Sequence, residues 1–218
     1  ERMLGAVVGV HGDDAGLIFP PKVAPIQVVL MPIASHIDEN VIVKVNSMAK
    51  DLKDAGFRVK IDDRDLRPGA KHYHWEIKGV PLRLELGPRD LAEDKFIMSL
   101  RTGGKEEFPT SSLIESVKDS LSLIESHLRS RSQELMDSKI SKFPGISKES
   151  GNWQLLGEIK DGMVYELAFD GNDSDAEIIE KSTGLAFLGD CVDPYETPQP
   201  CAITGRMTTR KQYLARMY

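Results

Sequence analysis

The sequence DDRDLRPGAKHYHWEIKGVPLRLELGPRD, residues 62–90, combines charged and aromatic side chains with turn signals. Between Arg58 and Lys105 there are eleven Lys or Arg and eight Asp or Glu, a local charge of +3 in a chain of 218 residues whose formal charge is −6. From Gly151 to Tyr218 the balance reverses, to six basic and eleven acidic residues. An acidic chain is poorly suited to coating nucleic acid, but its basic middle suits a phosphate-bearing partner.

A short helix and a strand are expected within this stretch. Pro68 suits the first turn of a helix, which we expect to run from Arg67 to Gly79. Pro81 then opens a strand over Leu82–Leu86, whose alternation places the leucines on the core face and the charged residues on the other. Four helix residues are spaced by three and four positions, and we expect them to form its core face: Ala70, Tyr73, His74 and Ile77.

The rest of the chain up to residue 131 alternates between strands and helices. Strands are expected over residues 26–33, 57–61 and 96–100, with a turn at Gly103 and Gly104. Asp38 is expected to cap a helix with a periodic apolar stripe, Val41, Val45, Met48, Ala49 and Leu52. A long amphipathic helix is expected from a second stripe, Leu113, Val117, Leu121, Ile124 and Leu128. This order predicts an α/β domain with a mixed or parallel sheet.

The two ends of the chain are less regular. Residues 1–12 are apolar, and periodicity alone leaves open whether they form a buried helix or a buried strand. Residues 138–150, rich in Ser, Lys and Gly, are expected to be a linker, and residues 151–218 a small α/β module. Two cysteines, Cys191 and Cys201, are too few for a disulfide framework. We expect a cytoplasmic protein without membrane-spanning segments, because no apolar run approaches about 20 residues.

Three segments together carry a resemblance to a known family. They are residues 62–90, the sequence HGDDAGLIFPP at 11–21 preceded by Arg2, and the terminal YLARMY at 213–218. The chain resembles the C-terminal region of prolyl-tRNA synthetases of the archaeal and eukaryotic type. The resemblance implies the end of a class II catalytic domain with its third signature motif at 1–22, and an anticodon-binding domain at 23–137, a mixed sheet flanked by helices.

The same resemblance implies which residues contact RNA. Glu76, Arg83, Arg89 and Lys105 match the positions that read the two guanines of the proline anticodon. Their chemistry fits, because a carboxylate accepts from guanine N1–H and N2–H while a guanidinium donates to O6 and N7. Three further basic residues are weaker candidates, for phosphate contact only: Arg64, Arg67 and Lys71. Taken without the resemblance, the charged residues would be ordinary solvated surface pairs.

Further implications concern the parent enzyme. Arg2 matches the arginine that holds the ATP phosphates, and Tyr218 matches a terminal tyrosine that folds back beside the active site. The expected partners are proline tRNA, with proline and ATP (with Mg²⁺) bound through a catalytic part missing here, and a second copy in a homodimer. Neither DNA nor a membrane is expected. The fragment alone is expected not to catalyse.

Many relatives hold zinc with four cysteines in the last module, and this chain departs from that pattern. The matching positions here are Asp170, Asp175, Cys201 and Thr204, which do not form the tetrahedral N and S ligand set of structural zinc. We therefore expect no zinc. The alternative to a synthetase part is a free-standing RNA or protein adaptor, which would have no use for Arg2 or for the terminal tyrosine.

Overall fold

The computed structural model describes residues 2–217, and the chain divides into two compact units, residues 1–132 and 133–218. Each unit has its own apolar core. No helix within residues 2–217 is both long and apolar enough to cross a membrane.

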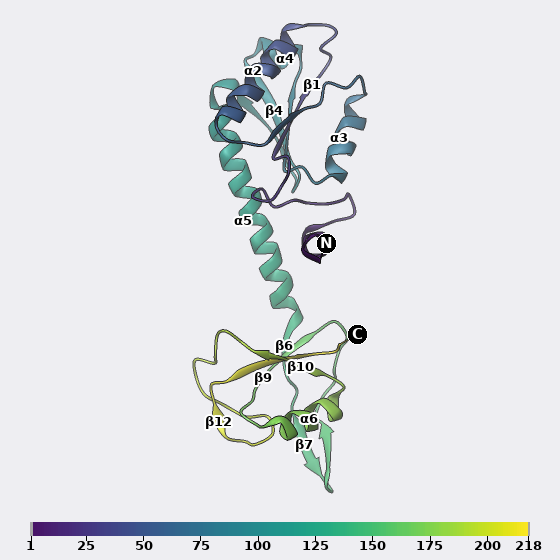
Figure 1. The fold of residues 1–218 in the computed structure, drawn as a ribbon, viewed down its shortest axis with the longest axis vertical. Helices are drawn as coiled ribbons and strands as arrows, with labels where there is room; N and C mark the ends of the chain where they lie inside the picture. Colours follow the sequence, from purple (N-terminus) through teal and green to yellow (C-terminus); the bar gives the residue numbers. More distant parts are fainter. Residues whose placement is uncertain (1, 218) are drawn as a thin grey trace. The chain divides into compact units, whose positions relative to one another are not determined.

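The first unit is built on a five-stranded sheet in the order β2-β1-β3-β4-β5 (Figure 1). The strands are β1 Val28–Pro32, β2 Val59–Ile61, β3 Leu82–Leu86, β4 Lys95–Leu100 and β5 Lys105–Pro109. The first three are parallel, and β4 and β5 each run antiparallel to their neighbours. The helical elements are α1 Arg2–His11, α2 Asn40–Asp54, α3 Pro68–Ile77, α4 Pro88–Ala92, a 3₁₀ turn at Thr110–Ser112 and α5 Leu113–Lys139. The expected mixed sheet is confirmed.

One face of this sheet carries the main core, under α2 and α5 (Figure 1). The expected stripes of both helices are buried against the leucines of β3 and against Phe96 and Met98 of β4. Burial of this apolar surface is the main contribution to the stability of the unit. Asp38 accepts a hydrogen bond from the Asn40 backbone N–H, although the helix begins two residues after it.

The opposite face is covered by α3, and here the expected core face of the helix is wrong. The buried residues of α3 are Lys71 and Trp75, whereas Tyr73 is 64% exposed and Ala70 and Ile77 are exposed too. Trp75 packs on a small second cluster with Val29, Met31 and Val80. Because α3 covers this face, Arg83 and Glu85 are buried instead of solvated. The choice of helical stripe missed that the largest apolar side chain, Trp75, sets the orientation of α3.

The N-terminal segment is a helix, α1, and none of its residues is buried. The expectation of a buried element at residues 1–12 is therefore wrong for the part that the structure describes. Most of its apolar side chains are exposed, with Met3 at 81% and Leu4 at 54%.

The second unit has a four-stranded sheet in the order β10-β13-β9-β6 and two small hairpins, β7-β8 and β11-β12. The strands are β6 Ile140–Lys142, β7 Ile146–Glu149, β8 Asn152–Leu155, β9 Val164–Ala168, β10 Ala186–Asp190, β11 Gln199–Pro200, β12 Met207–Thr208 and β13 Lys211–Ala215. Helix α6, Asp173–Thr183, buries Ile179 against Tyr165, Leu167 and Leu214. Residues 138–150, expected to be a linker, contain the end of α5 and strands β6 and β7.

Candidate nucleic-acid interface

Three neighbouring strands of the first unit place polar residues in one row. Arg83 of β3 pairs with Ser99 of β4, and Ser99 pairs with Lys105 of β5. Side chains of residues paired directly across strands lie on the same face of a sheet. The row therefore lies on the face that α3 covers, and it ends at Lys105, whose side chain is 53% exposed.

Arg83 is the most unusual member of this row. The residue is only 8% exposed, yet within residues 2–217 its Nε and Nη1 atoms have no hydrogen-bond partner. Its nearest charge is Glu76 on α3, with 3.7 Å between Nη1 and Oε1, too long for a hydrogen bond. Buried guanidinium nitrogens are costly to leave unpaired, so Arg83 is a candidate for contact with a ligand.

Beside this pair lies a second one. Glu85 is 8% exposed, and Lys105 Nζ lies 3.4 Å from each of its carboxylate oxygens. His72 Nε2 lies 3.2 Å from Glu85 Oε1, but the ring is not aligned for a hydrogen bond and Nε2 has no partner in the described part of the chain. Five residues thus form what we call the charged cluster: His72, Glu76, Arg83, Glu85 and Lys105.

Helix α3 is fixed over this cluster by a buried carboxylate at the end of β2. Asp62 is 2% exposed and accepts hydrogen bonds from Trp75 Nε1, Arg64 Nε and Arg64 Nη2, each at 2.7 Å. The buried Lys71 donates to the Asp62 carbonyl at 3.0 Å. The bidentate Arg64 contact lowers the pKa of Asp62 well below its usual range although burial opposes this, and the Trp75 hydrogen bond lowers it further.

The structure brings together three of the four predicted base-contacting residues: Glu76, Arg83 and Lys105. Arg89 is exposed on α4, just beyond the end of β3. Among the candidates for phosphate contact, Arg67 is exposed, whereas Lys71 is buried and donates to the Asp62 carbonyl, and Arg64 is engaged by Asp62.

Sequence reasoning missed His72 and Glu85 as members of the cluster. The spacing of these residues from Arg83 and Glu76 in the sequence indicates both of them. Glu85 is two residues after Arg83, so both lie on one face of the strand. His72 is four residues before Glu76, so both lie on one side of α3.

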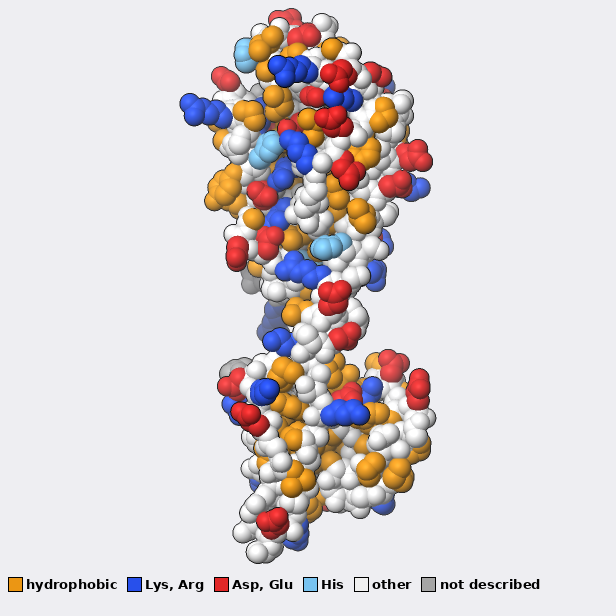
Figure 2. All heavy atoms as spheres, turned by 180° about the vertical axis from the view of Figure 1, so that it is seen from behind, with side chains coloured by type: hydrophobic (Ala, Val, Ile, Leu, Met, Phe, Trp, Pro, Cys, Tyr) orange, Lys and Arg blue, Asp and Glu red, His pale blue; other side chains and the backbone are white. Residues whose placement is uncertain are grey.

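The cluster contains two acid–base pairs, Glu76 with Arg83 and Glu85 with Lys105. Each pair offers a carboxylate acceptor next to a cationic donor, which is what the edges of a purine base require. Over one face of the molecule, Figure 2 shows basic and acidic side chains interleaved on the first unit rather than a uniformly basic surface. Such a surface favours specific contacts over general attraction to phosphate.

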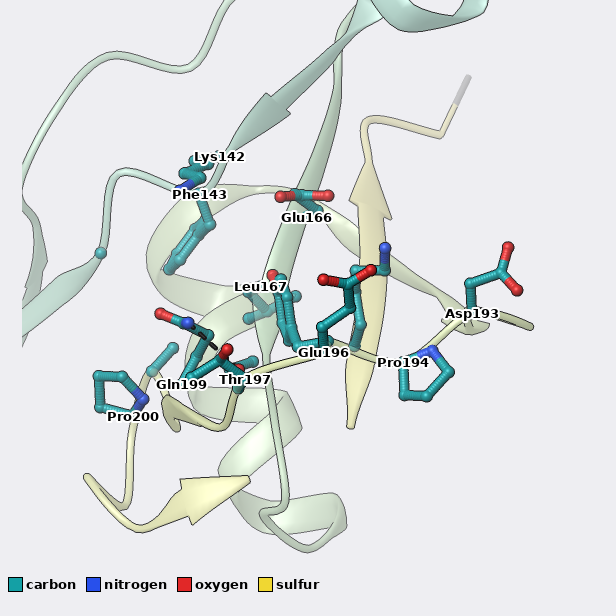
Figure 3. A pocket seen from close by; sticks show the side chains of 15 residues that line it. Lys142, Phe143, Glu166, Leu167, Asp193, Pro194, Glu196, Thr197, Gln199 and Pro200 are labelled. Atoms are coloured by element: carbon teal, nitrogen blue, oxygen red, sulfur yellow. Dashed lines mark hydrogen bonds between the residues drawn. The ribbon is translucent and has the colours of Figure 1, made fainter. Parts of the chain in front are cut away.

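The second unit has an open cavity of about 710 Å³ (Figure 3). Phe143, Glu166 and Glu196 line it together with Lys142 and the loop at 193–200. Burial, followed by the charge of Glu166, raises the pKa of Tyr195 in its wall to about 12, so its phenol is protonated at neutral pH. Among residues 2–217, no predicted site residue lines this cavity.

Three of the four positions that match the zinc ligands of relatives, Asp170, Cys201 and Thr204, are joined to one another. Thr204 Oγ1 donates to Asp170 Oδ1 at 2.8 Å, and the Asp170 backbone N–H lies 3.5 Å from Cys201 Sγ. Arg206 Nε lies 3.1 Å from Asp170 Oδ2. Asp175 accepts from the Asn172 backbone N–H as part of the cap of α6. Within residues 2–217 no group of three or more His, Cys, Asp or Glu is placed to hold a metal ion.

Adding a zinc chelator is expected to leave the second unit folded. The Arg206 guanidinium already occupies one side of Asp170, and a cation there would repel a divalent metal. Thermal unfolding measured with and without 1,10-phenanthroline should show midpoints that agree within about 1 °C, because loss of structural zinc costs far more than that. A fall of several degrees, reversed by added zinc, would contradict the expectation.

Arg2, one of the two residues predicted to serve the catalytic part, is not a member of the charged cluster. Arg2 is exposed in the first turn of α1. Tyr218 lies outside the residues that the structure describes.

Comparison with known proteins identifies relatives of this chain. Residues 27–120 match the family model for the anticodon binding domain. The whole chain is 35% identical to a proline–tRNA ligase of Thermococcus kodakarensis and covers 46% of it. A proline–tRNA ligase of Methanoregula boonei is 47% identical over 135 residues, which are 62% of this chain and 28% of that protein.

A solved structure matches over the same extent. It is described as a Giardia lamblia prolyl-tRNA synthetase in complex with prolyl-adenylate, with a TM-score of 0.82 and 27% identity. The match covers 100% of this chain and 48% of that one. This chain thus spans about half the length of the relatives it matches.

The first unit contains the mixed sheet, and its residues 27–120 are similar to the anticodon binding domain. The chain as a whole is homologous to the C-terminal part of archaeal-type proline–tRNA ligases. The resemblance and the fold class expected from the sequence are confirmed.

Proposed function

We propose that the chain is part of a proline–tRNA ligase and that the charged cluster reads the anticodon of proline tRNA. The observation that supports this most directly is Arg83, a buried guanidinium with two nitrogens that have no partner among residues 2–217. The identity to proline–tRNA ligases along the whole chain supports the choice of tRNA.

The proposed recognition uses both acid–base pairs. Arg83 donates to O6 and N7 of one guanine while Glu76 accepts from N1–H and N2–H of a neighbouring base edge. Lys105, held near Glu85, donates to the second guanine, and Arg89 contributes from α4. Bases in an anticodon loop are unstacked and expose these edges, as in other single-stranded RNA sites.

The parent enzyme is proposed to attach proline to its tRNA with ATP and Mg²⁺. Arg2 fits contact with the ATP phosphates, since an exposed guanidinium donates two parallel hydrogen bonds to phosphate oxygens. Tyr218 is proposed as the active-site tail, and a homodimer without zinc as the assembly. The chain on its own is proposed to select tRNA rather than to catalyse.

Glu76→Gln tests the proposal, because it keeps the shape of the side chain and removes its charge. The affinity of the chain for a proline-tRNA anticodon stem–loop should fall about 10- to 100-fold. In the complete enzyme, the KM for proline tRNA should rise while proline-dependent ATP–pyrophosphate exchange is unchanged.

Glu115→Gln is the matched control, since Glu115 is exposed on α5, on the other side of the sheet. It should leave the affinity unchanged. Equal binding by wild type and Glu76→Gln, or equal binding of stem–loops with and without the two guanines, would refute anticodon reading. An adaptor without catalytic function would show the RNA effect but no aminoacylation in the complete protein, and the homology to ligases does not favour it.

A further inference from the structure

Arg101, which follows β4, is a second buried arginine, and it differs from Arg83 in that its donors are used inside the protein. Its side chain is 2% exposed. Nη1 and Nη2 donate to the two carboxylate oxygens of Asp13, at 2.9 and 2.5 Å. Nη2 also donates to the Gly16 carbonyl, and Nε is shared between the carbonyls of Leu17 and Glu76, all at 3.1 Å.

These acceptors come from two segments that are far apart in sequence. Asp13, Gly16 and Leu17 belong to the loop that follows α1, whereas Glu76 is in the last turn of α3. The guanidinium lowers the pKa of Asp13 to about 2, first through its hydrogen bonds and then through its charge, so the carboxylate is ionised at neutral pH. The network of Arg101 therefore joins the loop to the helix that carries a proposed base-reading residue.

Backbone hydrogen bonds also join the loop at residues 13–19 to the end of α3, and we call this region of contact the junction. The N–H of Leu17 donates to the Ile77 carbonyl at 3.2 Å, and the N–H of Phe19 donates to the Gly79 carbonyl at 3.1 Å. A Cβ at Gly16, where φ is +132°, would lie 2.7 Å from the Ile77 Cα, and one at Gly79 would lie 2.5 Å from the Leu17 carbonyl oxygen. Only glycine at both positions allows the loop to lie directly on the end of α3.

The junction adds partners to a helix end whose carbonyls also accept from the following turn, with Gly79 N–H bound to the Glu76 carbonyl at 2.9 Å. Carbonyl groups in the last turn of a helix lack intrahelical acceptor bonds, and a positive charge is favourable beside them. Here the Arg101 guanidinium and the N–H of Leu17 bind the carbonyls of Glu76 and Ile77. The loop after α1, through Arg101, therefore contributes to the position of the Glu76 backbone in addition to the Gly79 hydrogen bond.

We propose that Arg101 is a positioning residue that couples RNA binding at Glu76 to the order of the loop at residues 13–19. This rests on the proposed anticodon reading. Arg101 does not touch RNA, and Asp13, its anionic partner, lies outside the charged cluster. Weakening the Asp13 contact lowers RNA affinity through the position of Glu76, and bound RNA in turn stabilises the loop, as reciprocal coupling requires.

Asp13→Asn tests the coupling in the 218-residue chain. It keeps the size of the side chain and removes the charge that Arg101 binds. The affinity for the proline-tRNA anticodon stem–loop should fall about 3- to 10-fold. Asp14→Asn changes the exposed neighbouring carboxylate and serves as the control; its affinity should equal that of wild type.

A double-mutant cycle with Glu76→Gln separates positioning from a general effect. If Asp13 acts through Glu76, then Asp13→Asn should have little further effect in the Glu76→Gln background. If the losses of RNA affinity of the two variants multiplied in the double mutant, or if Asp13→Asn alone caused no loss, the coupling would be overturned. A Glu76→Gln variant that binds as well as wild type would instead refute the anticodon reading itself, and with it the coupling.

Amide hydrogen exchange gives a readout that needs no variant. The stem–loop should slow exchange at the N–H groups of Leu17 and Phe19, because these bond to the end of α3. A stem–loop with both guanines replaced should not. Unchanged exchange at both amides under saturating RNA would also overturn the proposal.

Discussion

Arg83→Met should abolish most of the RNA affinity while leaving the fold intact. Methionine replaces the aliphatic part of the side chain and removes the guanidinium, so the loss of a bidentate base contact predicts about 2–3 kcal/mol, or roughly 30- to 150-fold in Kd. Binding of the anticodon stem–loop, measured by fluorescence anisotropy at fixed salt, checks this.

The free energy of unfolding of the same variant should not fall together with its RNA affinity. Arg83 carries two buried nitrogens without a partner in the described part of the chain, so their removal relieves a desolvation penalty. Glu76, whose side chain is 34% exposed, can be hydrated once its partner is gone. We therefore expect the free energy of unfolding to be equal to that of wild type or higher.

Lys118→Met is the control for this prediction. Lys118 is exposed on α5, and the substitution removes one positive charge away from the cluster. Its effect on Kd should be small and should disappear at higher salt. If Arg83→Met bound as tightly as wild type, or lost no more than Lys118→Met, Arg83 would not be a base-reading residue.

Asp62→Ala should destabilise the first unit by about 3 kcal/mol and lower its Tm by about 10 °C. The substitution removes the acceptor of three short hydrogen bonds and leaves the buried Trp75 N–H without a partner. Urea unfolding followed by tryptophan fluorescence measures the change. Asp63→Ala is the control, because Asp63 is exposed and adjacent in sequence; it should change the free energy of unfolding by less than about 0.5 kcal/mol.

The same carboxylate predicts how stability depends on pH. The pKa of Asp62 is lower in the folded protein than its ordinary value of 3.8. The stabilisation of the folded state by ionised Asp62 is therefore complete above about pH 4, and it is lost as the pH falls through the folded-state pKa. The difference in unfolding free energy between wild type and Asp62→Ala should be constant near neutrality and should shrink below pH 4. A difference that persisted unchanged at pH 2 would contradict the assignment.

Periodicity in the sequence was sufficient for the main core but not for α3. In α2 and α5 the apolar stripes are long and repeated, and all of their expected residues are buried. Helix α3 has only ten residues, and two stripes compete on it. Its orientation is decided by a tertiary contact, from Trp75 to Asp62, that no local pattern contains.

The candidate site was predictable in its residues but not in its environment. Resemblance to a family selected Glu76, Arg83 and Lys105, and the structure brings these three together. Alternation along β3 placed Arg83 away from the leucines, but it did not show that a helix covers that second face. Arg101 carried no sequence signal, since its partners are mostly backbone carbonyls from segments up to 85 positions away.

Lys105 matters for a second reason, because it lies on the edge strand β5. The order of the sheet ends at β5, so one side of this strand is open to pairing with another chain. Its first three residues, Lys105, Glu106 and Glu107, are exposed and charged, which is how natural proteins discourage edge-to-edge aggregation. A replacement such as Lys105→Gln keeps this edge polar. An apolar residue there would promote self-association, whose effect on measured RNA binding would be mistaken for the loss of an RNA contact.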